Sequence, residues 1–164
     1  MSAIQARQDA SGPRLDPERN AGFLLVSIAN RISASASRTY MRHFGVGVME
    51  WRVLAMLALK PGITANQIGQ ISAVDKSSVS RATASLLKRG YVRSIEDPAD
   101  SRRLMLYLTP PGRALHDRII VAALARDELL MDGLSAKERE TFFRLLHRVG
   151  SNTALLNAYD PSAT

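Results

Sequence analysis

The stretch that most constrains the fold of this chain covers residues 64–109, where the start and stop signals of short elements follow one another closely. Thr64 is followed three positions later by Gln67, which is the spacing of a capping box at the start of a helix. Asp75 is a favoured N-cap for a second helix, because its carboxylate accepts backbone N–H groups and suits the helix dipole. Gly90 then provides a C-cap. The pattern therefore predicts two short helices in tandem, separated by a short turn.

The next part of this stretch predicts two short strands. Residues 91–96 alternate only partly between apolar and polar side chains, whereas Leu104, Leu106 and Leu108 alternate clearly with their neighbours. The polar residues 97–102 between the strands are typical of a turn, which we expect to be longer than a tight hairpin needs. Two tandem helices followed by such a hairpin have the order of a helix-turn-helix with a β-wing.

The second of the two helices carries different side chains on its two faces. Val79, Ala82 and Leu86 share one face, at about 100° per residue, whereas hydroxyl and basic side chains lie on the other. Small hydroxyl side chains let a helix backbone approach the major groove of DNA, and arginine can make two hydrogen bonds to guanine. Serine is also a poor choice for a helix face that is only solvated. We therefore interpret this helix as a DNA-recognition helix, with candidate contacts at Lys76, Ser77, Ser78, Ser80, Arg81 and Lys88.

The hairpin supplies further candidate contacts. Arg102 and Arg103 are expected at its tip, where long cationic side chains can reach DNA phosphates or the minor groove. Asp100 precedes Arg102 by two positions and is expected to hold that arginine by a salt bridge. Taken alone, a charged hairpin fits better with a sheet edge that is protected against aggregation. Beside a helix-turn-helix, the DNA interpretation is favoured.

Longer helices are predicted on both sides of this region. Residues 21–44 place apolar side chains at steps of four, residues 48–59 are apolar on most sides, and a long helix fills residues 110–132. Ser135 and Glu138 form another capping box, which starts a last helix that continues toward residue 156. The apolar stripe of the first helix consists of Ile28, Ile32, Ala36, Tyr40 and Phe44. The predicted fold class is therefore mainly α with a small β-wing.

Composition limits the kind of partner and the compartment. The chain has 164 residues and a formal net charge of +7, which favours nucleic acid or a membrane surface as a partner, although a merely soluble basic protein has the same charge. The absence of Cys excludes disulfides, thiolate metal sites and cysteine redox sensors. No apolar run approaches the ~20 residues of a membrane span. Residues 1–20 lack the apolar segment of a secretory signal and are expected to form a mobile tail, so we predict a cytoplasmic protein.

The residues that could carry catalysis form no recognisable constellation. His43, His116 and His147 are far apart in the sequence, without the spacing of metal ligands. Ser77 and Ser80 lack the glycine-flanked turn of a nucleophilic serine, and the sequence has no glycine-rich phosphate loop. We therefore expect no enzymatic activity, no metal and no cofactor.

Three segments together resemble the MarR family of bacterial transcription regulators. They are EWRVLAMLA at residues 50–58, DKSSVSRATASLLKRGYV at residues 75–92 and DPADSRRLMLYLTPPG at residues 97–112. The resemblance implies a homodimer that binds a palindromic operator in double-stranded DNA, with half-sites about one helical turn apart, and that acts as a transcriptional repressor. The contacts of the family's recognition helix and wing correspond here to Ser77, Ser78, Ser80, Arg81, Asp100 and Arg102.

The resemblance also implies a division of the chain. Residues 1–20 would be a tail, residues 21–47 a dimerisation helix, residues 48–109 the winged helix-turn-helix, residues 110–158 C-terminal dimerisation helices and residues 159–164 a second tail. The apolar faces of the long helices agree with this division, because they exceed what one small DNA-binding head can cover. Gly47 and Pro111 depart from the family, which often has Ser or Thr and a helix former at these positions. The first departure predicts a weaker cap for the helix at residues 48–59, and the first turn of a helix tolerates the second.

Family members that lack a sensing cysteine are often regulated by a small aromatic or phenolic acid, bound between the dimerisation region and the DNA-binding head. The resemblance implies an effector of this kind. His43, Trp51 and Arg52 lie near where that cleft would be. Trp51 is expected in the core, and Arg52 fits a pair within the dimer better than an anion ligand, so the effector-binding residues stay unassigned.

Two other functions stay open on the sequence alone. A winged helix can serve as a protein–protein interaction module, and a basic helix-turn-helix can bind DNA with little sequence preference. DNA binding weakens steeply with salt because counterions are released, which separates it from protein docking. Footprinting separates the other alternative, because only an operator-binding protein protects a palindrome.

Overall fold

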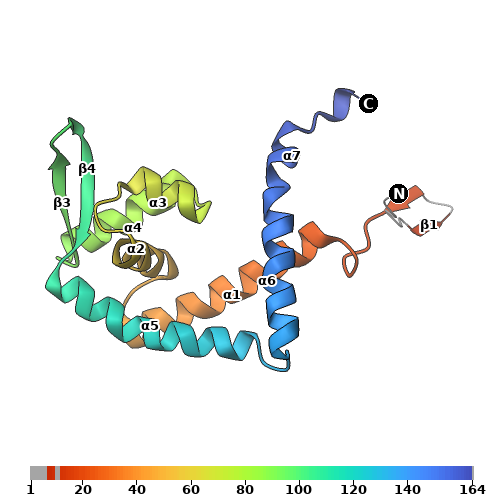
Figure 1. Ribbon diagram of the computed structural model, residues 1–164, viewed down its shortest axis with the longest axis horizontal. Coiled ribbons are helices and arrows are strands. Elements are labelled where there is room, and N and C mark those ends of the chain that lie inside the picture. The colour runs from red at the N-terminus through yellow and green to blue at the C-terminus, as the bar shows by residue number, and fades with distance from the viewer. Residues whose placement is uncertain (1–6, 10–11, 164) are drawn as a thin grey trace. The chain divides into compact units, whose positions relative to one another are not determined.

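The computed structural model describes residues 7–9 and 12–163. Two compact units make up the chain, Met1–Ile120 and Val121–Thr164. The structure is mainly helical with small two-stranded antiparallel sheets, as predicted (Figure 1). The elements are β1 (Arg7–Asp9), β2 (Gly12–Arg14), α1 (Ala21–Phe44), α2 (Val48–Leu59), α3 (Ala65–Ser72), α4 (Lys76–Lys88), β3 (Val92–Asp97), β4 (Asp100–Leu108), α5 (Pro110–Leu130), α6 (Ala136–Ser151), α7 (Thr153–Ala158) and η1 (Pro161–Ala163).

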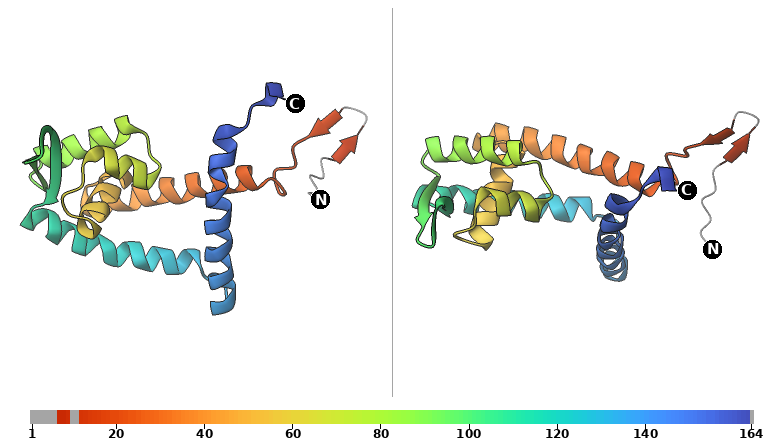
Figure 2. Two further views of the ribbon diagram at one scale, coloured as in Figure 1. Left: turned by 45° about the horizontal axis from the view of Figure 1, so that its top comes forward. Right: turned by 90° about the horizontal axis from the view of Figure 1, so that it is seen from above.

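Helix α2 is the centre of the first unit. It contacts α1, α3, α4 and β4, and Figures 1 and 2 show α2, α3 and α4 beside one another, next to the hairpin of β3 and β4. Val53, Leu54 and Leu57 of α2 are fully buried, together with Ile68 of α3 and Leu86 of α4. The apolar sides of residues 48–59 therefore meet neighbouring elements over most of the helix, although Leu59 at its end is 68% exposed.

The N-terminal caps of α3 and α4 are those that the sequence predicts. Thr64 Oγ1 accepts a hydrogen bond from the backbone N of Gln67 at 3.3 Å, and Gln67 Oε1 accepts one from the backbone N of Thr64 at 2.8 Å. Asp75 Oδ1 accepts a hydrogen bond from the backbone N of Ser78 at 2.8 Å. Between these helices, Ala73 adopts a left-handed conformation with φ of 49°, which closes the turn. The two helices and their turn form the predicted helix-turn-helix.

The hairpin of β3 and β4 is tighter than expected. The predicted loop at residues 97–102 is wrong, because β3 runs to Asp97, β4 begins at Asp100, and the turn contains only Pro98 and Ala99. Asp97 Oδ1 accepts a hydrogen bond from the backbone N of Ala99 at 3.0 Å, which replaces a longer loop by a local turn. Ile63 also bridges to Leu106 of β4, which ties the segment before α3 to the hairpin.

The start of α5 packs closely on the segment that follows α4. Thr109 Oγ1 accepts a hydrogen bond from the backbone N of Gly112 at 3.1 Å and donates one to the carbonyl oxygen of Gly90 at 2.6 Å. Thr109 therefore caps α5. Gly112 is buried, and a Cβ atom at this position would lie 1.9 Å from the carbonyl oxygen of Tyr91. Only glycine allows this close approach.

The second unit contains the end of α5 and the helices α6 and α7. Ser135 caps α6, because its Oγ accepts a hydrogen bond from the backbone N of Glu138, and Glu138 Oε2 accepts one from the backbone N of Ser135. The prediction of one continuous last helix is wrong, since α6 ends at Ser151 and α7 begins at Thr153. Hydroxyl groups compete for the backbone here: Ser151 Oγ donates to the carbonyl oxygen of His147, and Thr153 Oγ1 donates to that of Gly150.

The expected N-terminal tail lies partly outside the described residues, at residues 1–6 and 10–11. In the described part, β1 and β2 pair as short antiparallel strands, which the sequence analysis does not anticipate. None of the helices within residues 12–163 combines the length and the apolar character that crossing a membrane requires.

Candidate nucleic-acid interface

Helix α4 separates its buried and exposed faces as the sequence predicts. Val79, Ala82, Thr83 and Leu86 are buried against α2 and α3. Among the predicted contact residues, Lys76, Ser77, Ser80, Arg81 and Lys88 are exposed, and Ser78 is half-buried. The first turns of α4 thus present hydroxyl, ammonium and guanidinium groups to solvent on one side of a helix whose other side belongs to the core.

A hydrogen-bonded chain organises the first turns of α4. Asp75 Oδ1 accepts a hydrogen bond from Ser77 Oγ at 2.6 Å. Arg81 donates from Nη1 to Ser77 Oγ and from Nη2 to Ser78 Oγ, both at 3.2 Å. The guanidinium group therefore lies along the exposed face of the helix, held by two serines. A guanidinium in this position can exchange its serine partners for acceptors on a base edge, at little cost in side-chain order.

The carboxylate of Asp75 stays charged to low pH. Hydrogen bonds from the side chain of Ser77, and then from Ser78, lower the pKa of Asp75 from 3.8 to about 2, although the group is exposed. The positive charge of Arg81 adds to this effect. The N-terminal cap of α4 is therefore ionised throughout the neutral and weakly acidic range.

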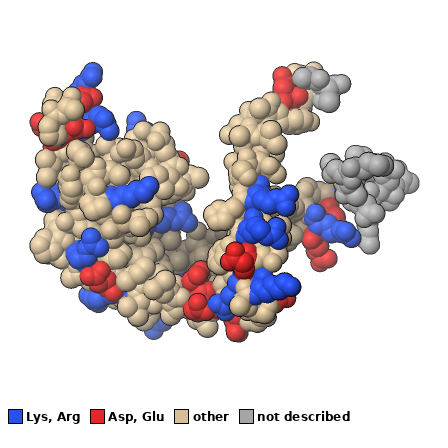
Figure 3. Space-filling view, viewed as in Figure 1, with Lys and Arg blue, Asp and Glu red and all other residues tan. Residues whose placement is uncertain are grey.

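Two ion pairs hold the basic side chains of the wing. Arg102 Nε lies 3.2 Å from Asp100 Oδ1, as predicted, and Arg103 Nη1 lies 3.6 Å from Asp97 Oδ2. Basic and acidic side chains accordingly lie beside one another at the tip of the hairpin in Figure 3. The side chain of Arg102 is 90% exposed, so its ion pair contributes little stability and leaves the guanidinium accessible. Both arginines lie on β4, a few residues beyond the turn rather than in a loop.

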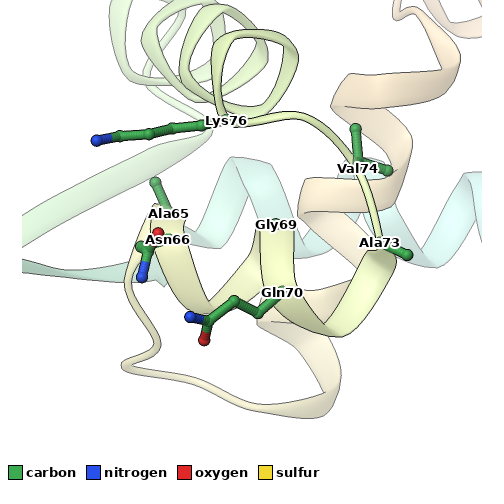
Figure 4. A pocket seen from close by; sticks show the side chains of 7 residues that line it. All are labelled: Ala65, Asn66, Gly69, Gln70, Ala73, Val74 and Lys76. Carbon is green, nitrogen blue, oxygen red and sulfur yellow. The ribbon is translucent and has the colours of Figure 1, made fainter. Parts of the chain in front are cut away.

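A second set of polar side chains lies on α3 and is missed by the sequence analysis. Figure 4 shows Asn66 and Gln70 of α3 together with Lys76 of α4 around a hollow of about 310 Å³. Asn66, Gln70 and Lys76 are exposed. The sequence signal was available, because positions 66 and 70 are one helical turn apart and polar, on the side of α3 opposite to the buried Ile68. Amide and ammonium groups from two helices are suited to the phosphates that flank a groove.

The predicted contacts do not all lie together. Lys88 is at the other end of α4, about 18 Å from Lys76 along the helix axis at 1.5 Å per residue. Ser77, Ser78 and Arg81 are joined by hydrogen bonds, and Asp100 joins Arg102, so these residues form two local groups. Helix α4 contacts β3, and this contact connects the group on α4 with the group on the hairpin.

The residues near the expected effector cleft contact other parts of the chain. Trp51 is half-buried and stacks on His116, with ring centroids 5.5 Å apart, and its edge meets Tyr40. Arg52 Nη2 donates a hydrogen bond to Ser33 Oγ at 3.4 Å. His43 is exposed and contacts Phe44. His116, which the sequence analysis treats only as an isolated histidine, is thus the close neighbour of Trp51. Among the described residues, no group of His, Cys, Asp and Glu is arranged to hold a metal ion.

Comparisons with known proteins agree on one family. A family model described as "MarR family" matches residues 44–103. A putative transcriptional regulatory protein for the hcr operon of Thauera aromatica is 31% identical over 113 residues, which are 69% of this chain and 68% of that protein.

Solved structures show the same likeness. A MarR/EmrR family transcriptional regulator from Acinetobacter sp. ADP1 has a TM-score of 0.81 at 25% identity, covering 86% of this chain and 99% of the other. The PcaV transcriptional regulator from Streptomyces coelicolor, solved in complex with its natural ligand, has a TM-score of 0.71 at 25% identity, covering 85% of this chain and 98% of the other.

Proposed function

The chain belongs to the MarR family of DNA-binding transcriptional regulators, and we propose that it binds a palindromic operator as a homodimer and represses transcription. Its relatives are transcriptional regulators, in agreement with the expectation that the chain is not an enzyme. The observation that carries the proposal is the exposed face of α4, where Arg81 is held by Ser77 and Ser78, beside a wing that exposes Arg102. A repressor of this kind acts in the cytoplasm, where it meets its operator.

We assign different roles to the basic and hydroxyl side chains. Arg81, with Ser77, Ser78 and Ser80, would contact base edges in the major groove, because these residues occupy the exposed first turns of α4. Lys76 and Lys88 would contact phosphates on the two sides of the groove, and Asn66 and Gln70 would add contacts from α3. Arg102 and Arg103 would reach the flanking backbone or minor groove, with Asp100 holding Arg102 in place.

The homodimer is supported by apolar side chains that the single chain leaves exposed. Phe23, Val26 and Ile28 of α1 are 49%, 61% and 50% exposed, although Ala36 and Tyr40 of the same helix are buried. Leu155 and Leu156 of α7 are 69% and 74% exposed. Apolar faces of this extent mark surfaces that another chain covers. A second copy, related by a two-fold axis, would cover them and set the spacing of two winged helices.

We also propose that an aromatic acid effector releases the operator. PcaV, which is similar to this chain, was solved with its natural ligand. An aromatic acid would stack on the rings of Trp51 and His116 in this chain. Its carboxylate would pair with the guanidinium of Arg52. Release requires that the effector binds one spacing of the two DNA-binding regions more tightly than the other.

The experiment begins with selection of bound fragments from genomic DNA, followed by footprinting of the recovered site. Arg81→Ala should then reduce the difference in binding free energy between operator and mismatched DNA by about 1–3 kcal/mol. Arg102→Ala should weaken binding to both DNAs alike, and the salt dependence of the affinity should fall by the amount of about one phosphate contact. Arg144→Ala, at an exposed position of α6, is the matched control. Equal binding of the parent, Arg81→Ala and Arg102→Ala to the operator would refute the assigned contacts.

Repression and release are tested separately. A reporter gene behind the recovered operator should be silent in the presence of the protein and active in its absence. A panel of aromatic acids added to the complex should contain at least one that frees the operator. If the protein activates the reporter, its proposed role changes from repressor to activator, and the assigned DNA contacts stay the same.

A further inference from the structure

The ends of three helices meet at Glu50, and the DNA-binding proposal uses none of the contacts found there. Glu50 lies in the first turn of α2, between Gly45 at the C-cap of α1 and the last turn of α4. Its side chain is only 12% exposed. A carboxylate that is withdrawn from water to this extent needs hydrogen-bond donors around it. Each of its two oxygens has such donors, and they come from two different helix ends.

One carboxylate oxygen completes the start of α2. Oε2 accepts a hydrogen bond from the backbone N of Gly47 at 2.8 Å. Gly47 has no side chain, so it cannot return the hydrogen bond that Ser or Thr would make in a full capping box. The start of α2 therefore depends on Glu50 alone for its side-chain cap. Gly47 therefore caps α2 weakly, as expected, and the hydrogen bond to Glu50 compensates in part for the missing side chain.

The other carboxylate oxygen holds the end of α4. Oε1 accepts a hydrogen bond from Ser85 Oγ at 2.6 Å and pairs with Arg89 Nη1 at 3.3 Å. The same Nη1 donates to the carbonyl oxygen of Gly45 at 3.0 Å, and the guanidinium lies 5.0 Å from the ring centroid of Tyr91. Through one guanidinium and one carboxylate, the end of α4 is thus joined to the end of α1 and the start of α2.

Packing on this side of α4 is incomplete. A hollow of about 290 Å³ lies between the helices, lined by Met41, Met49, Ala82 and the polar residues Glu50, Ser78, Arg81 and Ser85. This hollow is open to solvent, so no buried side chain lies there to resist a tilt of α4 on this side, whereas Val79 and Leu86 pack in the core on the other side. The hydrogen bonds of Glu50 are the directional contacts that oppose such a tilt.

We propose that Glu50 is a positioning residue for DNA recognition, which acts through Ser85 and Arg89 to fix the angle of α4 against α1 and α2. The inference rests on the proposed function, since it takes α4 as the recognition helix. A tilt of α4 changes the distance of Arg81 from the base edges, and specific contacts tolerate little displacement. Because Arg89 also holds the carbonyl of Gly45, the C-cap of α1, a movement of α1 is transmitted to α4 through the same contacts.

The sign of the effect distinguishes positioning from simple electrostatics. Glu50→Gln removes a negative charge from a protein that binds a polyanion, so charge alone predicts equal or tighter DNA binding. Positioning predicts that operator affinity falls about tenfold, because a charged acceptor for Ser85 and Arg89 is lost, while affinity for unrelated DNA is unchanged. Glu96→Gln, which removes an exposed carboxylate from β3, is the matched control and should bind at least as tightly as the parent.

The test compares full-length parent, Glu50→Gln, Ser85→Ala and Glu96→Gln for binding to the selected operator and to unrelated DNA at several salt concentrations. Ser85→Ala removes one donor and leaves the cap of α2 and the Arg89 pair intact, so it decides the outcome if Glu50→Gln fails to fold. Loss of operator affinity in Ser85→Ala and in any folded Glu50→Gln, with an unchanged salt dependence, supports the proposal. Parent-like operator binding by Ser85→Ala, or by folded Glu50→Gln, overturns it. Failure of the parent to bind any DNA refutes the proposed function instead.

Discussion

Asp75 shows at the scale of one residue how an exposed side chain can matter for both stability and recognition. Its carboxylate caps α4 and accepts the hydroxyl of Ser77, which in turn accepts a hydrogen bond from Arg81. Loss of the carboxylate would therefore free the first turn of the helix and the serine that holds the arginine. The same hydrogen bonds lower the pKa of Asp75 to about 2.

The lowered pKa predicts a pH dependence of stability. A carboxylate whose pKa is lower in the folded state contributes stability that is complete above its unfolded value of 3.8 and disappears as the pH falls toward about 2. Asp75→Asn should therefore unfold at a lower temperature than the parent near neutral pH, and the difference should shrink between about pH 4 and about pH 2. Thermal unfolding across this range is the measurement, with Asp132→Asn after α5 as an exposed control. A difference that stays constant down to about pH 2 would contradict the role given to the carboxylate.

Residues that act on near neighbours in sequence could be predicted, and residues that act on distant ones could not. The capping pairs Thr64 with Gln67 and Ser135 with Glu138 are three residues apart, so the spacing itself carries the information. Glu50 could be recognised only as a first-turn residue of α2. Its partners Ser85 and Arg89 are 35 and 39 residues away, and only the packing of α2 against α4 brings them together.

At the scale of elements, the contact between α5 and the segment after α4 is fixed by one glycine. Gly112 lies where a Cβ atom would be 1.9 Å from the carbonyl oxygen of Tyr91. Gly112→Ala must therefore move α5 away from Tyr91, which disturbs the hydrogen bond between Thr109 and Gly90. We expect a loss of about 1–3 kcal/mol in the free energy of unfolding, as for an overpacked core.

The control for this prediction is another helical glycine. Gly150 of α6 has no atom within 4 Å of an added Cβ. Gly150→Ala should leave stability unchanged or raise it by up to ~1 kcal/mol, because alanine favours the helix. Denaturant unfolding of both variants separates the two cases. Equal stabilities would show that α5 does not pack on Tyr91 in the way described.

Element boundaries were predicted well where a cap or a breaker marks them. Helices α1 and α2 begin and end at the predicted residues, because glycines follow α1 and Pro61 with Gly62 follow α2. The turn of the hairpin was predicted too long, since polar composition does not reveal that Asp97 closes a turn with Ala99. The break between α6 and α7 was missed for a similar reason, because hydroxyl groups at Ser151 and Thr153 redirect the backbone without a proline or a loop.

At the scale of the whole molecule, the second unit is too small to cover its own apolar side chains. Along α6 these side chains recur at helical spacing as one stripe, which consists of Phe142, Leu145, Leu146 and Val149, each between 36% and 46% exposed. The sequence predicts the stripe from its period. It does not predict what covers the stripe, because that depends on a surface outside the helix, and we propose that this surface belongs to a second copy of the chain.

Leu146→Glu tests the proposed homodimer at this stripe. In a dimer that buries the stripe, the substitution places a carboxylate where no water can solvate it, so the dissociation constant of the dimer should rise at least about tenfold. Arg144→Glu is the control, because residue 144 lies on the opposite side of α6 at about 100° per residue and also receives a glutamate.

Sedimentation at several concentrations measures the dimer directly, and binding to a full palindrome and to a single half-site measures its consequence. Leu146→Glu should lose the advantage of the palindrome over the half-site, while Arg144→Glu keeps it. If Leu146→Glu remains a dimer with parent-like affinity for the palindrome, the stripe of α6 is not the surface that joins two copies, and the spacing of the two DNA-binding regions must be set by other helices.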